Sequence, residues 1–197
     1  MSNQDFKTPP LSSRYEDALV YAARLHAHQA RKGTGIPYIS HLLTVSALVI
    51  QDGGDEDEAI AALLHDAVED QGGLRTLEEI RRLFGDHVAT IVEGCTDSMT
   101  HPKPPWRERK ERYLSHLEQV SSDVRRVSLA DKLHNARSIL RDLRREGDLV
   151  WGRFKGGKEG TLWYYHSLVK IFRDGASDYM SEELARVVEE IDCLLLG

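Results

Sequence analysis

The chain has 197 residues, of which 41% are hydrophobic, enough to bury the core of one domain. Its formal net charge of −6 argues against broad nucleic-acid binding, so an anionic ligand would need a local basic patch or a metal ion. The polar N-terminus has no apolar signal segment, and no stretch approaches the roughly 18 apolar residues of a membrane span. The two cysteines, Cys95 and Cys193, form no CxxC pair, so we expect reduced thiols in a soluble cytoplasmic protein.

The first part of the chain predicts a tail followed by a helix. We expect residues 1–12 to be a flexible N-terminal tail and residues 13–197 to form a single domain. Ser13 and Glu16 have the spacing of a capping box, which predicts a helix that continues over 17–30. The stretch at 31–37, which contains Gly33, Gly35 and Pro37, is predicted to end this helix.

In the rest of the chain, segments with apolar residues at helical spacing alternate with short stretches rich in glycine or proline that mark turns. Thr76 and Glu79 form another capping box, prolines forbid helix at 98–105, and a second glycine-rich loop is expected at 152–160. No convincing period-2 strand is present, so the prediction is an all-α, compact single-domain bundle of about eight to ten helices. The helices after the first are predicted over 38–51, 55–70, 77–85, 86–97, 106–120, 121–146, 161–172 and 181–196.

The helix predicted over 55–70 carries a cluster of ionisable side chains. At about 100° per residue, four of them fall within an arc of about 140°, opposite an apolar face. A solvated acidic face is one interpretation, but imidazole and carboxylate are also standard ligands of divalent cations. The four residues are His65, Asp66, Glu69 and Asp70, and the apolar face contains Ile60, Ala61, Leu64 and Val68.

The helix predicted over 121–146 has a stripe of short polar side chains opposite an apolar stripe. A merely solvated face would favour long charged side chains, so the alternatives are a functional site or a buried hydrogen-bond ladder between helices. His41, in the segment PYISH, is by itself more typical of a core histidine than of a ligand. The polar stripe is Asp131, Asn135, Ser138 and Asp142, and the apolar stripe is Leu129, Leu133, Ala136, Leu140 and Leu143.

Three motifs in this order resemble the HD superfamily of metal-dependent phosphohydrolases. They are HAHQARKGTGIPYISH at 26–41, HDAVED at 65–70 and LADKLHN at 129–135. Together they resemble the hydrolase domain of the RelA/SpoT-type alarmone enzymes, especially the small hydrolase-only members. The resemblance implies an HD-type fold and a guanosine-3′,5′-bis(diphosphate) 3′-pyrophosphohydrolase that uses a divalent metal, usually Mn²⁺, with Fe²⁺, Co²⁺ or Zn²⁺ as alternatives.

The same resemblance assigns roles by position. It implies that the metal ligands are His41, His65, Asp66 and Asp131. It implies that Glu69 and Asp70 orient and deprotonate the attacking water. It implies that the nucleotide substrate is held by Arg31, Lys32, Asn135 and Ser138.

Some features depart from this pattern and leave alternatives open. His28 stands where the family usually has Gly, and residues 151–165 do not match the alarmone hydrolases. The second hypothesis is therefore an HD-type phosphohydrolase that acts on another nucleotide or phosphoester, and the third is a non-catalytic HD regulatory module. A homo-oligomer is compatible with each.

Other segments allow weaker predictions. The basic run at 104–112 is expected to be mostly a solvated helix face, whereas Lys155 and Lys158 are candidates to reach a phosphate. Trp106, Trp151 and Trp163 are expected to pack in the core rather than to mark an interface.

Overall fold

A computed structural model describes residues 11–97, 102, 104–174 and 179–196. Within these residues the fold is all-α, as predicted, and the single β-type feature is an isolated bridge between Ala30 and Pro37. The helices are α1 (Ser13–Leu25), α2 (Ile39–Gln51), α3 (Glu56–Leu64), α4 (Ala67–Gln71), α5 (Leu74–Phe84), α6 (Asp86–Cys95), α7 (Trp106–Leu117), α8 (Ser122–Glu146), the 3-10 helix η1 (Gly147–Arg153), α9 (Gly157–Arg173) and α10 (Tyr179–Leu196).

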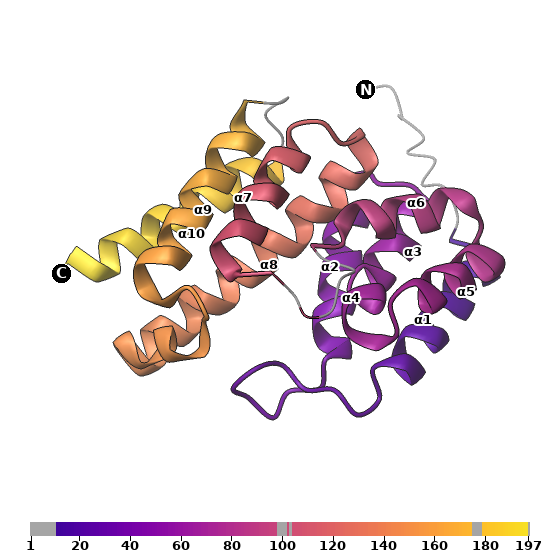
Figure 1. Cartoon of the computed structure of the whole chain (residues 1–197), viewed down its shortest axis with the longest axis horizontal. Helices are drawn as coiled ribbons and strands as arrows, with labels where there is room; N and C mark the ends of the chain where they lie inside the picture. Colours follow the sequence, from indigo (N-terminus) through magenta and orange to yellow (C-terminus); the bar gives the residue numbers. More distant parts are fainter. Residues whose placement is uncertain (1–10, 98–101, 103, 175–178, 197) are drawn as a thin grey trace, which may run out of the picture.

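The long helix α8 organises the bundle. It contacts α2, α3 and α6 from the N-terminal half and α10 and η1 from the C-terminal half. Figure 1 shows α8 between the group formed by α1 to α6 and the group formed by α7, α9 and α10. None of the described helices is both long and apolar enough to cross a membrane.

The core follows the apolar stripe predicted for α8. All five residues of that stripe are buried, and they share one hydrophobic cluster with apolar residues of α2, α3, α6, α9 and α10. Burying one leucine side chain contributes roughly 1.5–3 kcal/mol, so this stripe alone fixes which face of α8 points inward. The polar stripe lies on the other side of the same helix, where Asp131 is buried and Asn135, Ser138 and Asp142 are partly buried.

The prediction of one continuous helix over 55–70 is wrong, because the helix is interrupted at His65 and Asp66. The His65 Nδ1 atom lies 2.8 Å from the carbonyl oxygen of Ala62 and bonds to it. This carbonyl lies four residues before Asp66, whose N–H would take it in a continuous helix. The interruption therefore leaves His65 and Asp66 between two helices rather than on one continuous helical face.

Two predicted capping boxes are also wrong. Ser12, not Ser13, caps α1, because its hydroxyl accepts the N–H of Arg14. The helix α5 begins at Leu74, before Thr76, because Gly73 has a φ of +62° that permits an abrupt turn. A complete capping box exists instead at Asp55, at the start of α3.

The glycine-rich loop predicted at 152–160 is shorter than expected, since η1 ends at Arg153 and α9 begins at Gly157. A Cβ atom on Gly156 would lie 2.6 Å from the ring of Trp106, so this glycine allows close packing. Of the three tryptophans expected to pack in the core, Trp151 is buried there, whereas Trp106 and Trp163 are partly buried and pack against its edge. Most of the loop predicted at 98–105 and residues 1–10 of the predicted tail lie outside the described residues.

Candidate active site

The structure brings together the four residues expected to hold a metal ion. His41 lies in the first turn of α2, His65 and Asp66 occupy the break between α3 and α4, and Asp131 lies in α8. Asp66 Oδ2 is 3.1 Å from His65 Nε2 and 3.4 Å from His41 Nε2. Asp131 Oδ1 is 3.2 Å from His41 Nε2 and 3.5 Å from His65 Nε2.

The chemistry of this cluster fits a divalent cation. Both histidines are buried, and among the described residues their Nε2 atoms have no partner with hydrogen-bond geometry. Burial opposes a proton on His65, but Asp66 and Asp131 outweigh it and raise the pKa of the imidazole well above its ordinary value. The carboxylates therefore attract positive charge to this point. His41, His65 and Asp66 each place a ligand atom within 4.8 Å of the other two, and two imidazole nitrogens with a carboxylate oxygen form a donor set that suits a divalent cation.

Tyr38 orients Asp66 from outside the cluster. Its phenol donates a 2.5 Å hydrogen bond to Asp66 Oδ2. The ring stacks on His26 with 5.3 Å between centroids, and the Arg31 guanidinium carbon lies 5.6 Å from the same ring. Burial and then Asp66 raise the pKa of Tyr38 far above its usual value, so the phenol remains a proton donor.

His134 contacts the other side of His41. The two Nδ1 atoms are 2.6 Å apart, which requires one of them to donate to the other. Burial, with His41 and Arg31 nearby, lowers the pKa of His134 to about 3, so this imidazole is neutral at neutral pH. A neutral His134 can accept the Nδ1 proton of His41 and so direct the His41 Nε2 lone pair toward the carboxylates.

A cavity of about 520 Å³ opens beside this cluster. Its lining contains eight basic and four acidic side chains. The cavity therefore has a local excess of positive charge, which can attract an anionic ligand although the whole chain has a net charge of −6. All six residues expected to act on the water or the substrate line it, namely Arg31, Lys32, Glu69, Asp70, Asn135 and Ser138.

Asn135 connects the cavity with the metal-ligand candidates. Its Nδ2 atom donates to Asp131 Oδ1 at 2.6 Å, and its Oδ1 atom accepts from Arg31 Nη2 at 2.6 Å. The Ser138 hydroxyl donates to the carbonyl oxygen of His134 at 3.0 Å, which leaves its lone pairs to accept from a ligand. Asn135, Ser138 and Asp142 of the polar stripe of α8 thus form part of the cavity wall, and Asp131 lies behind it, bonded to Asn135.

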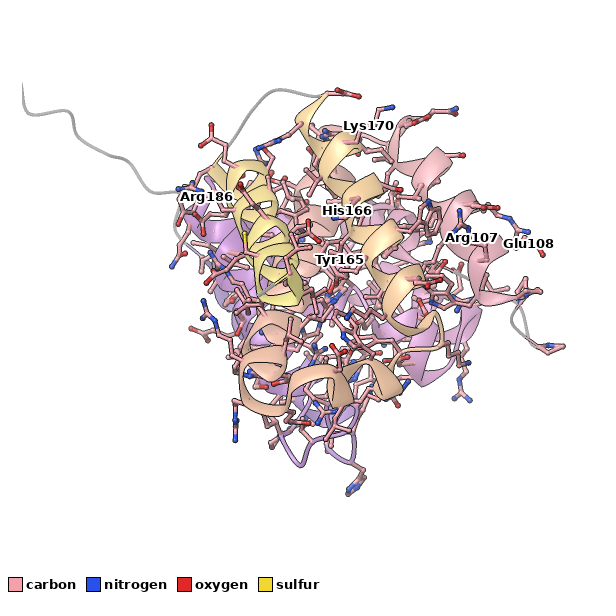
Figure 2. All side chains as sticks on the ribbon, turned by 90° about the vertical axis from the view of Figure 1, so that its left-hand side faces the viewer. Arg107, Glu108, Tyr165, His166, Lys170 and Arg186 are labelled. Atoms are coloured by element: carbon pink, nitrogen blue, oxygen red, sulfur yellow. The ribbon has the colours of Figure 1, made fainter. Side chains whose placement is uncertain are left out.

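The basic run at 104–112 was expected to be mostly exposed to solvent, but only two of its four basic side chains are exposed. Arg107 and Arg112 are exposed and pair with glutamates one turn away on α7. Figure 2 shows Arg107 at the outer edge of the molecule. Arg109 and Lys110 instead turn inward, where both pair with Asp97 and line the cavity.

The segment 151–165, which was expected from the sequence to differ from the alarmone hydrolases, also shapes the cavity. Arg153, Phe154 and Lys155 line it, as do Thr161, Tyr164 and Tyr165. The Lys158 ammonium instead lies 3.3 Å from the carboxylate of Asp148, and this lysine is not part of the lining.

Several site residues could have been found from sequence spacing, and others could not. Tyr38 precedes His41 by three residues and His134 follows Asp131 by three, which is one helical turn in each case. Asp97 had no such signal, because its partners are on α7, across the loop, and only the tertiary fold brings them together.

Comparisons with known proteins agree with this geometry. The HD domain family matches residues 18–162. The guanosine-3′,5′-bis(diphosphate) 3′-pyrophosphohydrolase MESH1 of Xenopus tropicalis is 44% identical over 132 residues, 66% of this chain and 69% of that protein. MESH1 of Mus musculus is 34% identical over 179 residues, 88% of this chain and 92% of that protein.

Two solved structures are similar over most of the chain. One, described as a metazoan ortholog of SpoT that hydrolyses ppGpp, has a TM-score of 0.76 and 28% identity, covering 91% of this chain and 96% of its own. The other, lmo0812 from Listeria monocytogenes EGD-e, has a TM-score of 0.69 and 33% identity, covering 77% of this chain and 97% of its own. The chain therefore belongs to the HD domain family, within the group that contains the MESH1 proteins.

Proposed function

We propose that this protein is a metal-dependent 3′-pyrophosphohydrolase that releases diphosphate from guanosine 3′,5′-bis(diphosphate). The observation that carries the proposal is that the His/Asp cluster lies next to a basic cavity large enough for a nucleotide, with Lys132 and Asn135 of its lining bonded to Asp131. The names of its MESH1 relatives, with identities of 34–44%, support the same activity. A substrate with a diphosphate on each of two ribose positions matches the positive charge of the cavity.

In this proposal His41, His65, Asp66 and Asp131 hold one divalent cation. Mixed nitrogen and oxygen ligation suits Mn²⁺, and the same donors accept Fe²⁺, Co²⁺ or Zn²⁺. The cation, when bound, lowers the pKa of water and offsets charge on the phosphoryl oxygens. The short bonds from Tyr38 and Asn135 hold Asp66 and Asp131 in the orientation that this role requires.

Glu69 and Asp70 are the proposed acid–base pair. Both line the cavity from α4, directly after Asp66, and Gln29 Nε2 donates to Asp70 Oδ2 at 2.8 Å. A carboxylate here can take a proton from the attacking water as its oxygen bonds to phosphorus. The bond from phosphorus to the ribose 3′-oxygen breaks, that oxygen takes up a proton, and the products are guanosine diphosphate and inorganic diphosphate.

The nucleotide is held by Arg31, Lys32, Asn135 and Ser138. The Arg31 guanidinium, fixed by Asn135 and by the ring of Tyr38, presents a planar charged group to a base or phosphate. Ser138 donates its proton to a backbone carbonyl, so its oxygen suits a donor such as a ribose hydroxyl better than a phosphate.

The experiment is to incubate the purified protein with guanosine 3′,5′-bis(diphosphate) and Mn²⁺ and to quantify both products. A panel of other nucleotides and simple phosphoesters is assayed in parallel, because the divergent segment 151–165 lines the cavity and favours a second candidate, an HD phosphohydrolase of another nucleotide. Diphosphate release from the guanosine compound supports the proposal. Activity confined to another member of the panel would support the second candidate.

A further inference from the structure

The two oxygens of the Asp131 carboxylate face different neighbours. Oδ1 accepts from Asn135, which is bonded to Arg31, whereas Oδ2 accepts from Lys132 Nζ at 2.5 Å. Arg31, Asn135 and Lys132 all line the cavity. The proposed metal centre is therefore joined to two basic parts of the lining, one through each oxygen.

The second basic part is a pair of lysines among aromatic rings. The Lys132 ammonium lies 4.9 Å from the ring centroid of Tyr113, and the Lys110 ammonium lies 5.9 Å from the same ring and 4.9 Å from that of Tyr164. Lys110 also contacts Asp97 Oδ2 at 2.9 Å. We call Lys110, Lys132 and Tyr164 the lysine cluster; all three line the cavity.

The positive charge of this cluster is only partly compensated. The side chains of Lys110 and Lys132 are 17% and 14% exposed, so solvent screens them little. Burial and the neighbouring Lys132 lower the pKa of Lys110, which means that the two ammonium groups repel each other. Asp97 is shared with Arg109, and Asp131 also faces the two histidines, so neither carboxylate serves the two lysines alone. Glu69 of the cavity lining also attracts Lys110, and an anionic ligand would add to this compensation.

Tyr164 provides an independent indication of a ligand. The residue is 6% exposed, and its hydroxyl has no hydrogen-bond partner among the described residues. Buried tyrosine hydroxyls usually find a partner, because an unpaired polar group costs about 1–3 kcal/mol. This hydroxyl belongs to a residue of the cavity lining, where a bound ligand can supply the missing acceptor.

We propose that the lysine cluster binds the terminal phosphoryl group of the 3′-diphosphate. The inference rests on the proposed function, which places the phosphorus under attack at the Asp131 side of the cavity. The terminal phosphoryl group is the next group along the diphosphate, and Lys132 is the basic residue bonded to Asp131. Two ammonium groups and one hydroxyl offer several donors to its oxygens, so the cluster selects a 3′-diphosphate over a 3′-monophosphate.

The decisive comparison uses two substrates that differ only in this group, guanosine 3′,5′-bis(diphosphate) and guanosine 5′-diphosphate 3′-monophosphate. We expect Lys110→Met to lower kcat/KM for the first substrate about tenfold or more and to leave that for the second within about twofold. The fold should tolerate Lys110→Met, because Asp97 keeps Arg109 as its partner. Lys170→Met is the matched control, because Lys170 is exposed on α9 (Figure 2) and lies outside the cavity lining.

A binding measurement separates this inference from the proposed function. Inorganic diphosphate is titrated calorimetrically into the full-length protein, with and without Mn²⁺, and Lys110→Met and Tyr164→Phe should each weaken its binding about tenfold. Tyr164→Phe removes an unpaired hydroxyl, so its Tm without ligand should equal or exceed that of the wild type. Unchanged diphosphate affinity in both variants, or equal losses of Lys110→Met on the two nucleotides, would overturn the inference. If the wild type hydrolyses no nucleotide but both variants bind diphosphate more weakly, the proposed function would be refuted and the lysine cluster would still be an anion-binding site.

Discussion

The hydrogen bond from Tyr38 to Asp66 allows a sharp test of the metal centre. Tyr38→Phe removes the phenol oxygen but keeps the ring that stacks on His26 and supports Arg31. The lost bond is 2.5 Å long and has an ionised acceptor. Bonds of this kind contribute about 1.5–3 kcal/mol, which corresponds to roughly a 10- to 100-fold change in an equilibrium constant.

We expect Tyr38→Phe to weaken Mn²⁺ binding by this factor, the usual effect of losing a group that orients a ligand. The measurement is calorimetric titration of Mn²⁺ into the metal-free protein, with metal content by mass spectrometry as a second readout. Tyr15→Phe is the control, because its phenol makes a 2.9 Å bond to Ser46 in the core of the N-terminal helices. That variant should lose about 1 kcal/mol of folding stability and no metal affinity. Mn²⁺ binding by Tyr38→Phe within twofold of the wild type would refute the reasoning.

Four further predictions follow from the same geometry. His65→Ala and Asp131→Ala should each lose most of their bound metal by elemental analysis, and full occupancy in both would exclude this centre. Glu69→Gln should retain the metal and lose kcat by roughly 10²-fold or more, whereas an unchanged kcat with a raised KM would assign Glu69 to substrate binding. Arg31→Ala should lower kcat/KM for the nucleotide by roughly ten- to a hundred-fold and barely affect a small phosphoester that cannot reach it; equal losses on both would give Arg31 a structural role. Asp97→Asn should reduce the free energy of unfolding by about 3–5 kcal/mol at neutral pH in denaturant titrations, because it removes the negative charge that faces the buried Arg109 and Lys110; a loss below 1 kcal/mol would contradict this. Burial opposes ionisation of Asp97, but Lys110 and Arg109 outweigh it and lower its pKa, so the wild type should lose this contribution as pH falls from near 4 through the folded-state pKa, and the variant should lack that part of its acid transition.

The helices themselves could be predicted well because their signals are local. The apolar stripe of α8 repeats at helical spacing, and each of its residues is buried as that spacing indicates. The predicted end of the helix at residue 51 is also correct, since Gly53 and Gly54 follow α2. Boundaries were less reliable, because glycines at 72 and 73 permit a turn that propensity alone does not locate.

The helix break at His65 shows why local pattern was insufficient within the candidate site. Periodicity over 55–70 indicates one straight helix, and no breaker residue stands at 65 or 66. In the folded chain Asp66 accepts a hydrogen bond from Tyr38, and His65 faces Asp131 of α8, so the interruption lies where distant segments make contact. The four side chains come from α2, the interruption between α3 and α4, and α8, so their approach depends on the packing of segments that are distant in the sequence.

The sequence by itself determined the fold class and the identity of the candidate donors. Helical periodicity is set within a few residues, and imidazoles and carboxylates in three ordered motifs can be recognised without coordinates. Only the tertiary structure decided which charges face each other. Arg109 and Lys110 look like members of a solvated basic run in the sequence, yet burial against Asp97 directs them into the cavity. The reason is that a charged side chain turns inward only where a partner from elsewhere in the chain offsets its desolvation, and the position of that partner is a property of the packed fold.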